Sequence, residues 1–412
     1  MIHKHAFLLF FYVYMFCSVV FTITEPRSYR NNKESLINLD VQNLPMQFMA
    51  VAALIAFAFS VLSYGLQKKN ELIQQNNKDA LIITSSALLF ISAAILSTFF
   101  GYKQYIKPYI FVEFFLFLSV FFVKDLELSI FIDTIKKILL FVIYGTTVLI
   151  FVDPLWSIQF EYDQGIINFL SARLYGLTTN SNYTAPLILL YLIFEIEFPS
   201  KSKMRNPTLI LSLLLILFTQ SKTTWILMFV YGLIKLIQQK RKINKKVLLT
   251  VSIFILLLPF LFLFFGNMIN FSTFTGRTII WNFTLDAWQN NKLFGYGMGL
   301  WNEEMFLHYK EQIKQGWVFS HAHSQYYQTL GETGIVGVIC LFIYFAVIVF
   351  FGVKYIEDTK GLSYYFALFL IIRGWTEPVF RHFFIDFNLY IHIIVFSYLI
   401  LVTKKSKKLK IM

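Results

Sequence analysis

The sequence predicts an all-α integral membrane protein. Its residues are 57% hydrophobic and only 14% charged, a composition that soluble globular domains do not have. Apolar runs long enough to cross about 30 Å of hydrocarbon recur along the whole chain. These runs are continuous rather than alternating, which indicates helices and not the strands of a barrel. We therefore expect about twelve transmembrane helices in a single polytopic membrane domain, residues 1–412.

The predicted spans follow the apolar runs in chain order. The first run resembles a signal peptide, but no small-residue cleavage site follows it, so we interpret it as an uncleaved helix. The polar stretch Thr219–Thr224 separates two runs that together are too long for a single crossing. The expected spans are residues 6–23, 46–66, 80–100, 106–123, 136–152, 183–198, 207–220, 223–239, 247–266, 333–352, 361–376 and 385–402.

Clustered lysines predict the orientation of the chain. The positive-inside rule places the clusters Lys240–Lys246 and Lys404–Lys410, and with them both termini, in the cytoplasm. Residues 153–182 and 267–332 then form two large extracytoplasmic loops, which we expect to contain short amphipathic helices. Within the second loop, Arg277–Gln289 has apolar residues at helical spacing, which predicts such a helix on the membrane surface. The lysines are explained by topology and contact with anionic lipid, so no nucleic-acid partner is expected.

The arginines follow the opposite distribution to the lysines. In this orientation the planar guanidinium groups gather on the outer face, where bidentate binding of phosphate or carboxylate would use them. This pattern predicts an anionic ligand there, and the alternative is a set of surface ion pairs. The outer tryptophans favour stacking on sugar rings or anchoring at the membrane interface. The arginines on or near the outer face are Arg27, Arg30, Arg173, Arg277, Arg373 and Arg381.

The long loop contains two motifs that bear on chemistry. The glycine run Gly295–Gly299 lacks the flanking strand and lysine of a nucleotide loop, so we interpret it as a tight turn where backbone approaches backbone. His321 and His323 are spaced like zinc ligands, but no third ligand lies nearby in sequence, and we expect no metal. A histidine there suits a general base or a phosphate contact, and the alternative is a structural role. Glycines at 331, 334 and 337 predict a small-residue face for close helix packing.

Several of these motifs resemble one family. His323-Ser324, followed after nine residues by Gly334 and then Gly337, is similar to the signature of the O-antigen ligase and polymerase family of bacterial membrane glycosyltransferases. The resemblance covers much of residues 170–380. Lys222 stands after Ser221, where the family commonly has arginine. Three further motifs are similar to motifs of the family. The first is Gly276-Arg277 followed by Trp281 and Phe294-Gly295-x-Gly297, and the second is Arg173-x-x-Gly176 followed by Asn180 and Asn182. The third is Arg373 followed by Glu377-Pro378.

The resemblance implies a glycosyltransferase in the bacterial plasma membrane. It would polymerise undecaprenyl-diphosphate-linked oligosaccharide repeats into O-antigen or capsular polysaccharide at the outer face. The leaving diphosphate is already activated, so no cofactor is expected. A flippase and a chain-length regulator are the expected protein partners. His323 would be the general base and Arg277 would act with it; the expected substrate-binding residues are Arg173, His321, Lys222, Arg373, Glu377 and Arg381, with Glu377 as an acidic partner or as the ion-pair mate of Arg373 or Arg381.

Three alternatives remain open at this point. An O-antigen ligase would transfer the glycan to lipid A core instead of to a second lipid-linked glycan. A lipid-linked glycan flippase or transporter would be expected to have charged residues or broken helices at mid-membrane. The predicted spans are nearly free of charge, with Glu113 and Glu195 as the main exceptions, which favours the transferase. The third alternative is a non-catalytic assembly subunit.

Overall fold

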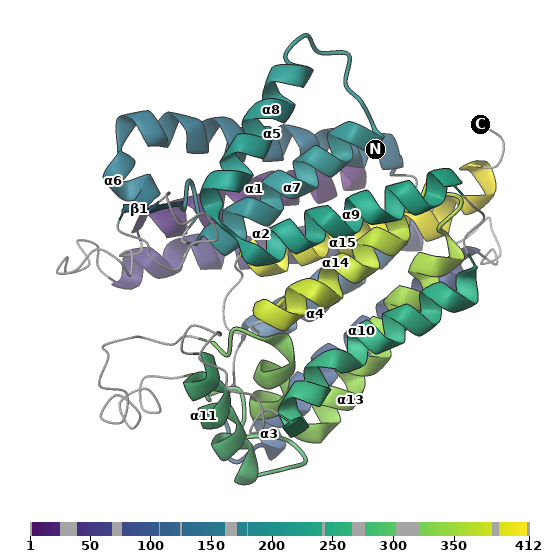
Figure 1. The fold of residues 1–412 in the computed structure, drawn as a ribbon. Helices are drawn as coiled ribbons and strands as arrows, with labels where there is room; N and C mark the ends of the chain where they lie inside the picture. The colour runs from purple at the N-terminus through teal and green to yellow at the C-terminus, as the bar shows by residue number, and fades with distance from the viewer. Residues whose placement is uncertain are drawn as a thin grey trace. The chain divides into compact units, whose positions relative to one another are not determined.

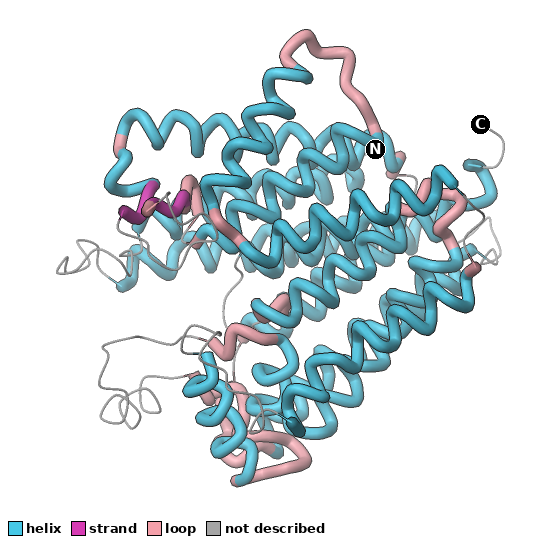
Figure 2. Tube along the Cα trace, in the orientation of Figure 1, coloured by secondary structure: helices cyan, strands magenta, loops and turns pink. Residues whose placement is uncertain are grey.

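A computed structural model describes most of the chain, and the described part is almost entirely helical (Figures 1 and 2). The all-α membrane class is supported by this architecture. The chain divides into two compact units that interleave in sequence. The first unit comprises residues 1–69, 122–232 and 385–394, and the second comprises residues 70–121, 233–384 and 395–412. The described residues are 2–24, 39–67, 76–106, 108–123, 126–160, 171–178, 180–240, 244–265, 277–301, 321–380 and 387–409.

A helix occupies every range predicted as a span. The largest differences in boundary are at α5, which begins at Leu128 rather than near residue 136, and at α13, which begins at Gln325 rather than near residue 333. In α5, Lys136 is accommodated inside the helix because its ammonium group pairs with Glu195. The helices are α1 (Ile2–Thr24), α2 (Leu39–Gln67), α3 (Asn76–Phe100), α4 (Tyr109–Phe122), α5 (Leu128–Val152), α6 (Pro154–Ser157), α7 (Ser181–Glu197), α8 (Arg205–Thr219), α9 (Lys222–Lys240), α10 (Lys245–Phe265), α11 (Arg277–Gln289), α13 (Gln325–Lys354), α14 (Leu362–Thr376) and α15 (Phe387–Leu409).

Length and composition separate these helices. Among the described residues, the helices long and apolar enough to cross a membrane are Lys78–Phe100, Leu128–Val152, Gln325–Lys354 and Phe387–Lys404. Others are apolar but shorter: α4 has 14 residues, which at about 1.5 Å per residue falls short of about 30 Å of hydrocarbon. The number of crossings and the orientation of the chain therefore stay predictions.

In the first unit, the predicted outer loop 153–182 is more structured than the sequence indicated. Asp153 accepts a hydrogen bond from the Trp156 backbone N–H and so caps the single turn α6. An antiparallel hairpin follows, formed by β1 (Ile158–Phe160) and β2 (Ala172–Leu174). The strands are too short for an alternating pattern to be recognised in sequence. Arg173 lies on β2 and is thereby held next to the start of α7.

The first unit also buries an ion cluster formed by α5, the end of α7 and the start of α8. Glu195 is 1% exposed, and its carboxylate lies 3.0 Å from the Lys136 Nζ and 3.3 Å from the Arg205 Nε. The Ser200 backbone N–H donates to the same carboxylate at 2.7 Å. Burying an acidic side chain at this depth requires such compensation, which explains why Glu195 is tolerated inside a predicted span.

The second unit is built around α13, which packs against α3, α10, α11 and α14 (Figure 1). The helix is broken at Gly334, where φ is +63° and ψ is −159°. The loop 291–297 supplies the hydrogen bonds that the break removes. The Tyr296 N–H donates to the Gly331 carbonyl at 2.7 Å, and the Ile335 N–H donates to the Lys292 carbonyl at 3.0 Å.

The glycines of this region serve backbone contacts. Gly295 and Gly297 have φ values of +74° and +109°, which confirms the predicted tight turn. The predicted small-residue packing face is wrong at Gly334, because a Cβ there would lie 2.4 Å from the Leu293 carbonyl oxygen of the facing loop. Gly334 is therefore required by a close backbone approach at a helix break and by its positive φ.

Candidate active site around Glu377

Three chain segments of the second unit converge on one carboxylate. The first residue of α11 is Arg277, as predicted. The bend 321–324 precedes α13 and carries His321 and His323. Glu377 follows the last residue of α14, and its backbone N–H donates to the Arg373 carbonyl at 2.9 Å, which ends that helix. These residues are distant in sequence, and the packing of α11 and α14 against α13 brings their segments together.

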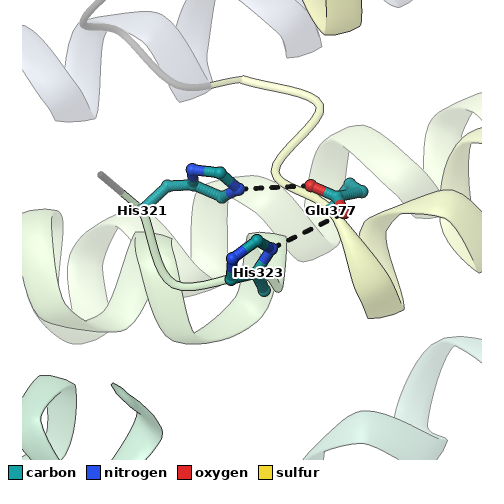
Figure 3. A group of neighbouring side chains, drawn as sticks. All are labelled: His321, His323 and Glu377. Carbon is teal, nitrogen blue, oxygen red and sulfur yellow. Dashed lines mark hydrogen bonds and ion pairs between the residues drawn. The ribbon is translucent and has the colours of Figure 1, made fainter. Parts of the chain in front are cut away.

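The Glu377 carboxylate is 1% exposed and is contacted by groups that can carry positive charge. Its Oε2 lies 3.2 Å from the His321 Nε2, and its Oε1 lies 3.6 Å from the His323 Nδ1 (Figure 3). The Arg277 Nη2 lies 3.9 Å from the same Oε1. The imidazole rings of the two histidines are in contact, with ring centroids 4.1 Å apart. One buried anion thus holds two imidazoles and a guanidinium together.

These neighbours decide the ionisation of Glu377. Burial alone would raise the pKa of its carboxyl group, because the charged form loses its water. The positive charge of His323 and the hydrogen bond from His321 act in the opposite direction and hold the Glu377 pKa well below its usual range. Glu377 is therefore a carboxylate at neutral pH, and it favours donation of an N–H by the ring nitrogens that face it.

His323 has the most exposed side chain of the three drawn in Figure 3. It is 24% exposed, against 7% for His321 and 1% for Glu377. Its backbone φ of +49° lies in the left-handed region, which residues other than glycine adopt infrequently and which occurs often at functional sites. The ion pair with Glu377 uses Nδ1, and no residue in the described part of the chain is hydrogen-bonded to the Nε2 of the ring.

The Arg277 side chain is held by a hydrogen bond to the backbone and is partly exposed. Its Nη1 donates to the Thr376 carbonyl at 3.2 Å, directly before Glu377. Its side chain is 21% exposed. The guanidinium is therefore fixed at the edge of the cluster at the first residue of α11, where a helix N-terminus also favours an anion.

The cluster has the donor set of a metal site. One ligand atom each from His321, His323 and Glu377 lies within 4.8 Å of the others. Sequence reasoning found no third ligand because Glu377 is far from the histidines in the chain. The Arg277 guanidinium, 3.9 Å from the same carboxylate, opposes a further cation because like charges repel. The expected absence of a metal stays a prediction.

Two predicted substrate-binding residues belong to the first unit. Arg173 is half-buried there; its Nη2 donates to the Asn182 side-chain oxygen at 3.0 Å and its Nε donates to the Thr219 carbonyl at 3.3 Å. Ser221 donates to the same Asn182 oxygen at 3.2 Å. Lys222 is the exposed first residue of α9. Residues 173, 182 and 221 thus form one polar cluster, which the separate motifs did not predict.

The remaining predictions have different outcomes. Arg373 is 1% exposed, so protein encloses its side chain and it is not displayed on a surface. Arg381 lies outside the described residues, as do Arg27 and Arg30. Trp281 is 9% exposed and stacks on Tyr327, so it is not available for the expected stacking on a sugar. This packing could not be predicted from the sequence, because Trp281 and Tyr327 lie on different helices.

A comparison with known protein families identifies a related region. Residues 207–342 match the family model described as O-antigen ligase. The matched region contains Lys222, Arg277, His321 and His323, and it ends before Glu377. No curated protein matches the chain. The match supports a glycosyltransferase-like role in glycan processing for a multi-pass bacterial membrane protein.

Proposed function

We propose that this chain, which its residues 207–342 place in the O-antigen ligase and polymerase family, polymerises glycans linked to undecaprenyl diphosphate. The reaction would take place at the outer face of the plasma membrane and would yield O-antigen or capsular polysaccharide. The observation that carries the proposal is the cluster around Glu377. A buried carboxylate holds a partly exposed histidine next to a partly exposed arginine, which suits the activation of a hydroxyl group beside an anion.

His323 is the general base of the proposed reaction. The Glu377 carboxylate lies 3.6 Å from its Nδ1, which favours a proton on Nδ1 and so the tautomer in which Nε2 can take a proton. The acceptor hydroxyl oxygen forms a bond to the anomeric carbon of the donor sugar as its proton passes to Nε2. The bond between that carbon and the diphosphate oxygen breaks, and the diphosphate leaves with the electron pair. Such proton transfer contributes about 10²- to 10⁴-fold to the rate.

Cationic groups stabilise the departing diphosphate. Arg277 stands beside the base, and its planar guanidinium can bind two phosphate oxygens at once. His321 shares the carboxylate of Glu377 and, when its ring is protonated, adds a second donor through Nδ1. Electrostatic stabilisation of a leaving group is most effective where water is excluded, and the burial of Glu377 provides such surroundings. Arg173, Lys222, Arg373 and Arg381 stay the further candidates for binding the lipid-linked substrate.

A ligase is the second candidate, because the matched family model is described as O-antigen ligase. The same base and arginine would then transfer the glycan to lipid A core. A flippase or transporter is favoured less, since the cluster is formed by residues before α13, after α14 and at the start of α11, not by charges in the middle of a helix. A flippase and a chain-length regulator are partners of the proposed polymerase.

Replacing His323 by alanine in the bacterium that encodes the chain tests the proposal. We expect His323→Ala to reduce glycan transfer by about 10²-fold or more, while the protein stays in the membrane at its normal level. The matched control is His5→Ala, which removes an exposed histidine in α1. Surface glycans are separated by size on gels, and transfer is also measured with purified protein and extracted lipid-linked glycan, with and without a chelator.

The glycan pattern separates the candidate functions. Loss of a polymerase leaves single repeat units on the surface anchor, whereas loss of a ligase detaches polymers from it. Undiminished transfer by the His323→Ala protein would refute the assignment of the base. Accumulation of lipid-linked glycan at the inner face in a deletion strain would favour a transporter. Loss of transfer upon chelation would show that the His321, His323 and Glu377 cluster works with a metal ion.

A further inference from the structure

The turn between the two histidines is tied down on both sides of Ala322. The indole Nε1 of Trp281 donates to the Ala322 carbonyl at 2.9 Å. The Ala322 N–H donates to the side-chain oxygen of Gln328 at 2.8 Å. Ala322 itself is fully buried, so water does not replace either bond. The backbone between His321 and His323 is thus held by two side chains, one on each side of Ala322.

Trp281 is itself held rigidly. It stacks on Tyr327, with ring centroids 4.7 Å apart and an interplanar angle of 4°. The tryptophan comes from α11, one turn after Arg277, and the tyrosine comes from α13. The stack therefore connects the helix that begins at Arg277 with the helix that follows His323.

A third side chain ties the segment that follows Glu377. The Phe380 N–H donates to the side-chain oxygen of Gln325 at 2.7 Å, and the Gln325 Nε2 donates to the Thr329 hydroxyl at 2.9 Å. Gln325 is the first residue of α13, two positions after His323, and it is 1% exposed. The chain on the carboxylate side of the cluster is thus connected to the chain on the histidine side.

The backbone of His323 has an unusual conformation that these hydrogen bonds would maintain. Its φ of +49° is unfavourable for a residue with a Cβ, and such a conformation persists only where the surroundings determine it. Released from the ties at Ala322, the turn would relax toward an ordinary conformation. The His323 ring would then move away from Glu377, and a displacement of about 1 Å can cost a catalytic group about 10²-fold in rate.

We propose that Trp281, Gln325 and Gln328 are positioning residues that hold His321 and His323 facing Glu377. We name them the histidine clamp. The inference rests on the proposed function for its effect on transfer, and on geometry alone for its effect on the two histidines. The clamp acts through His323 and does not contact the substrate in this account.

Matched tryptophan variants test the clamp. Trp281→Phe keeps an aromatic ring on Tyr327 and removes the donor to Ala322. Trp288→Phe is the control, because Trp288 lies on the same helix and its indole also donates to a backbone carbonyl, that of Lys292, at 2.9 Å. We expect Trp281→Phe to lower kcat by about tenfold with KM unchanged, and Trp288→Phe to leave both near wild type. Gln328→Leu should repeat the effect of Trp281→Phe.

A double variant separates positioning from general damage. If Trp281 acts through His323, adding Trp281→Phe to His323→Ala should cause no further loss of transfer. A further tenfold loss of transfer in the double variant would overturn the proposal. So would a loss of transfer in Trp281→Phe that disappears when the rate is divided by the amount of folded protein.

Chemical labelling tests the clamp without any glycan substrate. Diethyl pyrocarbonate modifies accessible neutral imidazoles, and peptide mass spectrometry reports each histidine separately. His321 is only 7% exposed, so its modification should be slow in the wild type. We expect Trp281→Phe to increase the rate of His321 modification roughly several-fold, because the turn then opens locally more often. Trp288→Phe should leave that rate unchanged. Equal labelling in all three proteins would refute the clamp, even where transfer by the wild type had confirmed the proposed function.

Discussion

Each unit of this protein buries a glutamate among cations, and the two arrangements differ in kind. Glu195 of the first unit and Glu377 of the second are both 1% exposed. Lysine, arginine and a backbone N–H contact Glu195 within 3.3 Å. Two histidines contact Glu377 within 3.6 Å, and its arginine lies farther away at 3.9 Å.

The difference lies in the partners and not in the depth of burial. Lysine and arginine keep their charge across the ordinary pH range, so the cluster of Glu195 is a fixed structural element. Histidine gains and loses a proton near neutral pH, and His323 is also partly exposed. A buried carboxylate that orients such a ring creates a proton acceptor. In the proposed mechanism, the same type of residue therefore stabilises the fold in one unit and supports proton transfer in the other.

The largest effect should come from replacing each glutamate by glutamine. We expect Glu377→Gln to lower the rate of transfer per folded molecule by about 10²-fold or more, because the amide no longer fixes the tautomer of His323. Glu195→Gln should leave that rate unchanged and reduce stability by about 3 kcal/mol, since the buried Lys136 then keeps only the exposed Asp133, 3.6 Å away, as its counter-ion. Turnover and thermal unfolding of the purified proteins measure the two effects. A loss of transfer in Glu195→Gln, together with a loss of stability but not of transfer in Glu377→Gln, would contradict the comparison.

A smaller effect should follow from conservative changes of the two arginines. Arg277→Lys keeps the charge and loses the planar fork, so we expect KM for the lipid-linked donor to rise by about tenfold. Arg205→Lys retains a cation beside Glu195 and should leave KM unchanged. Initial rates at varied donor concentration provide the measurement. Identical KM values for Arg277→Lys and the wild type would show that Arg277 does not bind the diphosphate.

The sequence predicted the helices well and the partners of Glu377 poorly. Hydropathy is a local property, so the ranges of α3 and α13 could be recognised without tertiary structure. The histidines and Arg277 lie in local motifs, which also can be recognised. The meeting of Glu377 with all three depends on how α11 and α14 pack against α13, and no pattern in one segment reports that. The break at Gly334 and the role of Gln328 were missed for the same reason, because the partner segment lies elsewhere in the chain.

The smallest expected effect concerns stability at acidic pH. The pKa of Glu377 is well below its usual range in the folded protein, whereas in the unfolded chain it returns to about 4.3. The unfolded state therefore binds this proton more readily. The stability that Glu377 contributes is fully present above the unfolded pKa and is lost as the pH falls below it toward the folded value. Between about pH 5 and pH 3 the unfolding temperature of the wild type should fall more steeply than that of Glu377→Gln. Parallel curves for the two proteins would mean that the histidines do not hold the carboxylate in its charged form, and the distinction drawn between the two buried glutamates would lose its electrostatic basis.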